Sequence, residues 1–169
     1  SHKLYDANPE TKIAAAILLG EGSAKLMEAI NWIPDVYHLN ESHALPLAFY
    51  LYQKYKNIDE VKSRLVYTNH TPEASGNQVC GIPFLERMSF FCDIPLAEII
   101  AITKVENDNL NLTLVALRLS KKANAVSKLH QRTLCKTWAN ENSTCEIISV
   151  TNAQDHGFWS DRPLYDALK

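Results

Sequence analysis

Residues 66–77 of this 169-residue chain read VYTNHTPEASGN and place four hydrogen-bonding side chains directly after an apolar run. These side chains belong to Thr68, Asn69, His70 and Thr71. Two other segments end in a similar way, HLNESH at 38–43 and SVTNAQDH at 149–156. Amide, hydroxyl and imidazole groups with little net charge suit a ligand rich in hydroxyl groups, such as a sugar. They suit a bare phosphate poorly.

The short apolar runs before these polar residues are typical of strands. We expect strands in DVYHLN (35–40), SRLVYTN (63–69) and EIISVTN (146–152). Helical segments separate them, so the sequence predicts an α/β fold with a mostly parallel sheet flanked by helices. Ligands bind beyond the carboxyl ends of strands in such sheets. We therefore expect one polar rim formed by Asn40, Glu41, His43, Asn69, His70, Thr71 and Asn152.

A structural interpretation of the same residues is that Asn and Ser cap helices and turns. For Asn40 and Ser42 this interpretation has at least equal weight. It has less weight for His70, because a polar ring just past a strand is costly to place without a role.

The helices are expected from periodicity and capping signals. Asn8-Pro9-Glu10 is typical of a helix start, and Gly20 and Gly22 are expected to break or bend the alanine-rich helix that follows. Later helices are expected over 43–55, 84–91, 95–103 and 110–138, with a loop over 72–83. The last helix contains His130, for which we expect a packing role.

The composition narrows the function classes. A hydrophobic fraction of 46% supports a sizeable core, and we expect a single domain over residues 1–169. The net charge of −2 without a basic block argues against nucleic acid or an anionic membrane as partner. No apolar run is long enough to span a bilayer, and the first residues do not form a signal peptide, so we expect a cytoplasmic location.

The four cysteines have no spacing typical of a zinc site. We expect them to be reduced thiols, and we expect no metal. They are Cys80, Cys92, Cys135 and Cys145.

Four blocks occur in the order found in the α-glucan phosphorylases (glycogen, starch and maltodextrin phosphorylases), and the bacterial short type is the most similar. The blocks are VYHLNESHALPLAFYL, LVYTNHTPEASGN, NLTLVALRLSKKANAVSKLH and ISVTNAQDHGFW. The chain resembles this family from about Leu4 to its end. The resemblance implies a partial Rossmann-like lobe of a glycosyltransferase-B fold, the later part of the N-terminal lobe. The C-terminal lobe, with the lysine that holds pyridoxal 5′-phosphate, has no counterpart here.

In the family, phosphate attacks the terminal glucose of an α-1,4-glucan with retention, helped by the cofactor's phosphate, and forms glucose 1-phosphate. The resemblance implies that His70 contacts this glucose near O6 and the anomeric carbon, and that Asn152 also holds O6. Glu41 and His43 match the acid and the histidine of the pocket below the sugar. The neighbouring Asn40, Asn69 and Thr71 complete the substrate-binding rim.

The resemblance assigns two apolar positions and also shows departures. Val126 matches an apolar wall of the glucosyl site, and Trp159 matches a tryptophan that lines the cofactor pocket. Ala125, Ala153 and Ser23 stand where the family has glycines. Glycine allows close backbone approach, so each added Cβ is expected to narrow the space near the crevice.

These observations favour a fragment or divergent member of an α-glucan phosphorylase, inactive by itself, with α-1,4-glucan, phosphate and the missing C-terminal lobe as partners. An incomplete lobe exposes an apolar face and a strand edge, so we also expect self-association. Two alternatives stay open. One is a non-catalytic carbohydrate-binding or regulatory α/β domain, favoured by the lost glycines. The other is an α/β interaction domain whose resemblance is only ancestral.

Overall fold

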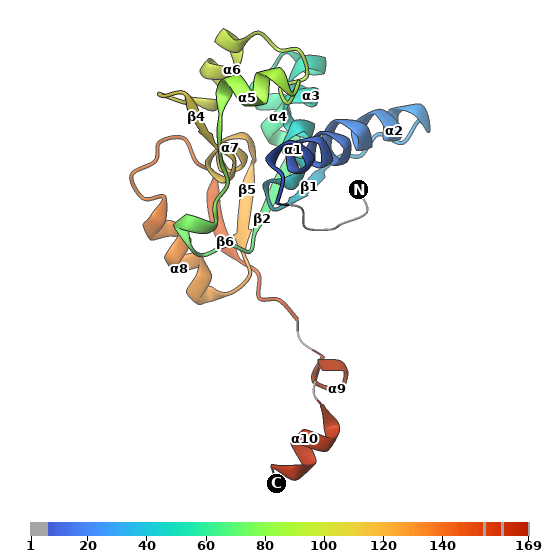
Figure 1. Ribbon diagram of the computed structural model, residues 1–169, viewed down its shortest axis with the longest axis vertical. Helices are drawn as coiled ribbons and strands as arrows, with labels where there is room; N and C mark the ends of the chain where they lie inside the picture. Colours follow the sequence, from blue (N-terminus) through green and yellow to red (C-terminus); the bar gives the residue numbers. More distant parts are fainter. Residues whose placement is uncertain (1–6, 154, 160, 169) are drawn as a thin grey trace.

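A four-stranded parallel sheet organises the chain (Figure 1). The computed structural model describes residues 7–153, 155–159 and 161–168, so that Leu4, where the resemblance begins, lies outside the described residues. The strand order is β1-β2-β5-β6. These strands are β1 (Tyr37–Asn40), β2 (Leu65–Asn69), β5 (Lys122–Ala125) and β6 (Glu146–Ser149). The α/β class with a parallel sheet is thereby confirmed.

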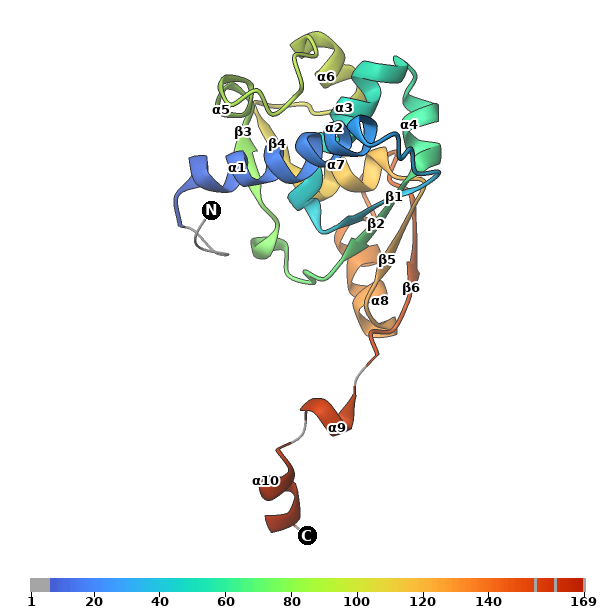
Figure 2. The ribbon, with the colours of Figure 1, turned by 90° about the vertical axis from the view of Figure 1, so that its right-hand side faces the viewer.

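Helices connect the strands, and α7 and α8 lie on the same side of the sheet (Figure 2). An antiparallel pair, β3 (Val79–Gly81) and β4 (Asn109–Asn111), forms a second small sheet. No helix in the described part of the chain is long and apolar enough to cross a membrane. The α-helices are α1 (Pro9–Ile17), α2 (Ser23–Ala29), α3 (Pro46–Tyr55), α4 (Ile58–Arg64), α5 (Ile82–Arg87), α6 (Leu96–Thr103), α7 (Leu112–Leu119), α8 (Lys128–Thr137), α9 (His156–Trp159) and α10 (Arg162–Ala167).

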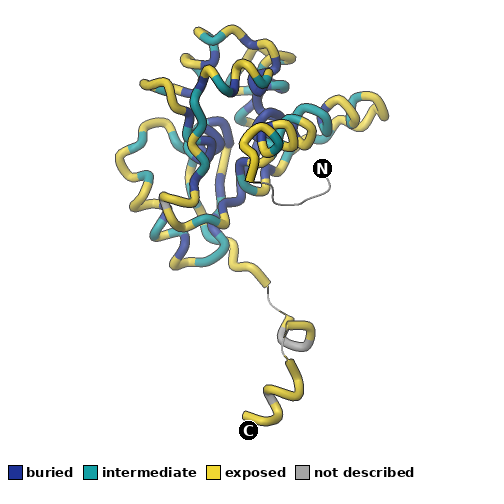
Figure 3. The backbone as a smooth tube through the Cα atoms, viewed as in Figure 1, coloured by how far each residue is buried: buried dark blue, intermediate teal, exposed yellow. Residues whose placement is uncertain are grey.

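The core lies on one face of the sheet (Figure 3). Alternate strand residues such as Leu39, Tyr67 and Ala123 are buried there against the helices. Phe49 packs edge-to-face with Phe91, with ring centroids 5.2 Å apart, and thereby helps to fix α3 in the core. This alternation is the period expected of strands with one buried face.

The opposite face of the sheet carries a row of polar side chains across three strands. His38 Nε2 lies 2.6 Å from Thr68 Oγ1, and the Thr68 hydroxyl donates to Asn124 Oδ1 at 2.7 Å. His38 in this row and the nearby Lys122 are exposed. Parallel sheets are usually covered on both faces. The open face is therefore a surface on which a further layer can pack.

The long helix expected over 110–138 is wrong. The segment divides into β4, α7, β5 and α8. The chain leaves the helical conformation at Ser120, whose ψ is 153°, and Ala123 and Ala125 then enter the sheet beside Tyr67 and Asn69. Alanine favours helices by local propensity, but backbone pairing on both sides of β5 outweighs that preference.

Other boundaries also differ from the sequence-based expectations. The expected interruption at Gly20 and Gly22 is present as a π-type segment over Leu18–Gly22, which joins α1 to α2 without a loop. The expected loop over 72–83 contains β3, whose partner β4 lies about thirty residues later in the chain. Short strands paired over long separations leave little local signal in the sequence. The Asn8 cap and the strands ending at Asn40 and Asn69 are confirmed.

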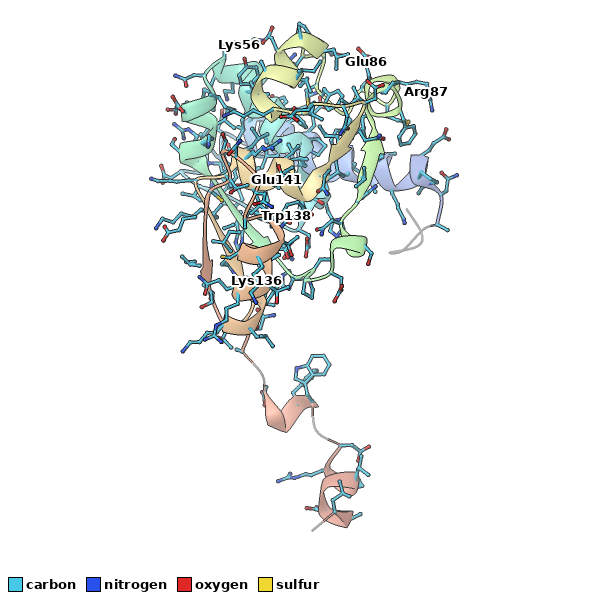
Figure 4. All side chains as sticks on the ribbon, turned by 90° about the vertical axis from the view of Figure 1, so that its left-hand side faces the viewer. Lys56, Glu86, Arg87, Lys136, Trp138 and Glu141 are labelled. Atoms are coloured by element: carbon cyan, nitrogen blue, oxygen red, sulfur yellow. The ribbon has the colours of Figure 1, made fainter. Side chains whose placement is uncertain are left out.

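Arg118 ties the end of α8 to the rest of the domain. Its guanidinium donates to the carbonyl of Thr103 at 2.8 Å and to the Glu141 carboxylate at 2.8 Å. Figure 4 shows Glu141 and Trp138 together at the end of α8 that is nearer the domain body.

Gly20 allows the first helix to approach the start of α3 closely. A Cβ at this position would lie 2.7 Å from the Leu47 nitrogen and 2.8 Å from the Ala44 carbonyl oxygen. Both are backbone atoms, so the clash cannot be relieved by a side-chain rotation. The absence of a Cβ thus lets α1 and the following π segment pack on the turn Ser42–Ala44, which directly follows β1.

We expect Gly20→Ala to lower the free energy of unfolding by about 1–3 kcal/mol, because overpacking forces backbone shifts. Urea denaturation followed by circular dichroism measures the change. The matched control is Gly81→Ala, where a Cβ would meet no atom within 4 Å. A Gly20→Ala protein as stable as the Gly81→Ala protein would contradict this packing.

Candidate functional site

The carboxyl ends of all four parallel strands meet at one edge of the sheet, at the bottom of the domain body in Figure 1. The sequence predicted three of these ends, and β5 supplies the fourth. The rim defined here comprises Asn40, Glu41, His70, Thr71, Val126 and Asn152. It combines one carboxylate with neutral donors and acceptors.

The Glu41 carboxylate joins the end of β1 to the end of β2. Its Oε1 accepts the main-chain N–H of His70 and the Thr71 hydroxyl, the latter at 3.1 Å. Its Oε2 accepts the Tyr67 hydroxyl at 3.2 Å. Burial, followed by the nearby Glu41 charge, raises the pKa of Tyr67, so the phenol stays protonated and can donate. The Glu41 carboxylate therefore holds the β2 loop, the segment that follows β2 and begins with His70 and Thr71.

The backbone of Glu41 is strained. Its φ of 59° and ψ of −178° lie in a region that residues other than glycine rarely adopt. Its own N–H nevertheless continues the strand ladder by donating to the Thr68 carbonyl at 2.9 Å. The three hydrogen bonds of the carboxylate offset the strain. Such strain is concentrated at ligand-binding and catalytic sites in general.

The His70 ring is exposed at the rim and is oriented by Asn40. His70 Nε2 lies 2.8 Å from Asn40 Oδ1. The amide oxygen can only accept, so Nε2 carries the proton in this pair. In the neutral ring, Nδ1 is then an acceptor that can receive a hydroxyl group of a ligand.

Asn69 does not line the crevice, contrary to the expectation from the sequence. Its side chain is fully buried. Its Nδ2 donates to the Tyr67 hydroxyl oxygen at 3.0 Å, and its Oδ1 accepts the Thr71 N–H at 3.0 Å. Both ends of the amide are thus used within the protein. Asn69 supports the turn that presents His70.

The β5 side of the rim is held by main-chain bonds. The Val126 carbonyl accepts the Asn152 N–H at 3.1 Å, so the segments after β5 and β6 lie side by side. The Val126 N–H is directed at Nδ1 of His130, 3.4 Å away. His130, for which the sequence suggested only packing, is therefore a neighbour of the rim. The Ser127-x-x-His130 spacing, which places a capping serine before the histidine, was the available signal.

The structure does not bring every predicted residue to the rim. His43 is exposed on the turn after Glu41, and no hydrogen bond joins it to the rim within the described ranges. Trp159 is 77% exposed on α9, which extends away from the domain body (Figure 1). Ala125 is fully buried and Ala153 is exposed. The Cβ of Ala125 thus packs inside the protein and does not project into the crevice.

The described residues contain no group of three or more metal-ligating side chains that could hold an ion. All four cysteines are free. Burial raises the pKa of the Cys92 thiol to about 12 and that of Cys145 to about 11, so these thiols are poor nucleophiles.

Comparison with known proteins agrees with the parallel α/β sheet. The family model described as the starch synthase catalytic domain matches residues 1–145. The chain belongs to this glycosyltransferase family. Together with the parallel α/β sheet, the match is consistent with a glycosyltransferase-B type of lobe.

The relatives include phosphorylases. The chain is 31% identical to the maltodextrin phosphorylase of Thermococcus litoralis over 80% of its length, and 30% identical to the glycogen phosphorylase of Aquifex aeolicus over 98%. It is 39% identical over its full length to an uncharacterised protein of Methanocaldococcus jannaschii. The matches cover 17%, 27% and 32% of those three proteins, respectively. The resemblance to the phosphorylases is confirmed.

We expect Glu41→Gly to be more stable than Glu41→Ala by about 1–3 kcal/mol, because glycine removes the backbone strain while both variants lose the carboxylate. Chemical denaturation of the two proteins measures the difference. At an ordinary backbone position the order is reversed, since glycine costs more entropy on folding. His43→Gly and His43→Ala are the control pair, because His43 has no positive φ. If Glu41→Ala were instead more stable than Glu41→Gly, the backbone at position 41 would not be strained.

Proposed function

We propose that this chain supplies the glucosyl-binding side of an α-1,4-glucan phosphorylase, which forms glucose 1-phosphate from glucan and phosphate. The observation that carries the proposal is the Glu41-anchored rim, which presents His70 at the carboxyl ends of parallel strands. The similarity to two phosphorylases over most of the chain supports it.

Each rim group has a task in binding the terminal glucose. The Nδ1 atom of His70 accepts a sugar hydroxyl, since Asn40 holds the opposite nitrogen as a donor. The exposed amide of Asn152 binds the O6 side of the same glucose. The half-buried side chain of Val126 forms an apolar wall. Glu41 and Thr71 position the loop and close the lower side of the pocket.

The main chain at His70 contributes to the transition state. Glycosyl transfer builds positive charge at the anomeric carbon, and a fixed carbonyl dipole nearby stabilises that charge. The Thr71 N–H, which shares a peptide group with the His70 carbonyl, donates to Asn69 Oδ1 at 3.0 Å, so this peptide group cannot reorient during the reaction. The carbonyl dipole is therefore already oriented in the folded protein before the substrate binds.

Pyridoxal 5′-phosphate does not fit a site made by this chain alone. No lysine side chain in the described ranges is buried, and Trp159 lies on an exposed helix away from the rim. The resemblance to the phosphorylases implies that the cofactor lysine belongs to a C-terminal lobe. We propose that this second lobe is a required partner.

A second candidate function is favoured by the match to the starch synthase catalytic domain. In that case the same rim binds glucose during its transfer from a nucleotide-activated donor, and inorganic phosphate is not a substrate. A non-catalytic carbohydrate-binding domain is the third candidate. Its support is the exposed alanine at position 153, where the phosphorylases have glycine.

The test is an activity assay on the product of the complete open reading frame that contains these 169 residues. We expect glucose 1-phosphate to form from maltodextrin and phosphate, and we expect none from the 169-residue chain alone. Turnover that requires a nucleotide-activated glucose would favour the second candidate. Sugar binding without turnover from either donor would favour the third.

In that protein, we expect His70→Ala to lower kcat and kcat/KM for phosphorolysis together, by roughly a hundred- to a thousandfold. The reason is that His70 contacts only the reacting glucose, whereas the rest of the glucan is bound elsewhere. Steady-state kinetics at varied maltodextrin concentration measures the effect. His38→Ala is the control, since His38 is exposed on the open sheet face. Wild-type kinetics for His70→Ala would reject the assignment.

We further propose that the isolated chain self-associates through its open sheet face and exposed apolar residues. Trp32, Ile33 and Val36 are all more than half exposed just before β1, at one edge of the sheet. Open edges and apolar patches of this kind promote association. Light scattering at rising protein concentration checks this, and a strictly monomeric profile would count against an incomplete lobe.

A further inference from the structure

His130 is a buried histidine placed between the two halves of the rim. It lies in the first turn of α8, and its own N–H is capped by the Ser127 hydroxyl oxygen at 3.1 Å. The residue is only 7% exposed. The cap fixes the start of the helix directly after β5, and this places the imidazole beside Val126.

The hydrogen bond from Val126 defines the protonation of the ring. The Val126 N–H can only donate, so Nδ1 of His130 must be unprotonated to accept it. In a neutral ring, Nε2 then carries the proton. This Nε2 is buried and has no hydrogen-bond partner among the described residues. A buried donor without a partner is costly, which makes it unusual in a structural role.

The groups that face the ring come from the other half of the rim. They are the main-chain carbonyl of Thr71, the Glu41 carboxylate and the His70 ring. Burial lowers the pKa of His130, the Thr71 carbonyl and Glu41 act in the opposite direction, and His70 lowers it further. The neutral form is therefore favoured at neutral pH, which agrees with the hydrogen bond from Val126.

We propose that His130 is a positioning residue that couples the two halves of the rim. Its Nδ1 holds the Val126 N–H, and its Nε2–H donates to the Thr71 carbonyl when a glucosyl unit fills the crevice. The sugar draws the β2 loop and the β5 end together through His70 on one side and Asn152 on the other. The Thr71 carbonyl already lies close to the ring, and the bound sugar brings it to full hydrogen-bonding geometry with Nε2–H.

The first test uses the 169-residue chain and needs no catalysis. Long-range ¹H–¹⁵N spectra of the imidazole at pH 7.5 are expected to show the neutral tautomer with the proton on Nε2. In His130→Phe, which keeps a ring but has no donor or acceptor, the Val126 amide is expected to exchange with solvent faster. The opposite tautomer, or a charged ring, would overturn the proposal.

The second test addresses sugar binding and rests on the proposed function. Adding maltotriose to saturation is expected to shift the Nε2–H resonance and slow its exchange. In the complete protein, His130→Phe should lower kcat by about 10- to 100-fold, as misplacement of a reacting group does. His130→Gln, which keeps a donor near the Nε2 position, should recover part of that loss. Unchanged turnover in His130→Phe would overturn the proposal.

The two failures are distinguishable. If the proposed function is wrong, the unaltered protein neither binds maltotriose nor turns over glucan, whereas the tautomer and the Val126 exchange rate are unaffected. If only the role of His130 is wrong, the unaltered protein is active and His130→Phe has the same kcat. Equal melting temperatures of His130→Phe and His130→Gln then show that the two variants are equally well folded.

Discussion

The bond between the Glu41 carboxylate and the main chain of His70 determines the site. It connects the ends of two neighbouring parallel strands and holds a loop that the sheet itself does not pair. The rest of the domain supports this contact. Gly20 lets the segment after α1 pack on the turn that follows Glu41. The buried Asn69 side chain accepts the Thr71 N–H. The strained backbone of Glu41 is tolerated because three hydrogen bonds oppose it.

The polar strand ends could be predicted from the sequence because they follow from local patterns. The expected strands end at Asn40, Asn69 and Asn152, and parallel strands bring such ends to one edge. The first two ends are as expected, whereas the third strand stops three residues earlier, at Ser149. The missing strand, β5, could not be predicted in this way. Its residues Lys122–Ala125 have helical propensity, and only pairing with distant strands makes them extended. The position of His130 beside the rim depends on that strand.

The direction of individual side chains was also beyond the sequence. Asn69 and His70 are adjacent, yet the first is fully buried and the second is exposed, because a strand turns successive residues to opposite sides. The uncovered face of the sheet is likewise a feature that could not be predicted from the sequence. Its polar row of His38, Thr68 and Asn124 resembles a ligand site in composition, so the rim and this face are competing surfaces for a sugar.

The most direct measurement is a ¹H–¹⁵N correlation spectrum of the 169-residue chain titrated with maltotriose. We expect saturable shift changes to concentrate on the amides of His70, Thr71, Val126 and Asn152, which come from the ends of three different strands. The dissociation constants measured at these residues should agree, since one ligand contacts them all. Shift changes confined to His38 and Asn124 on the open face would contradict sugar binding at the rim, as would the absence of shift changes at any concentration.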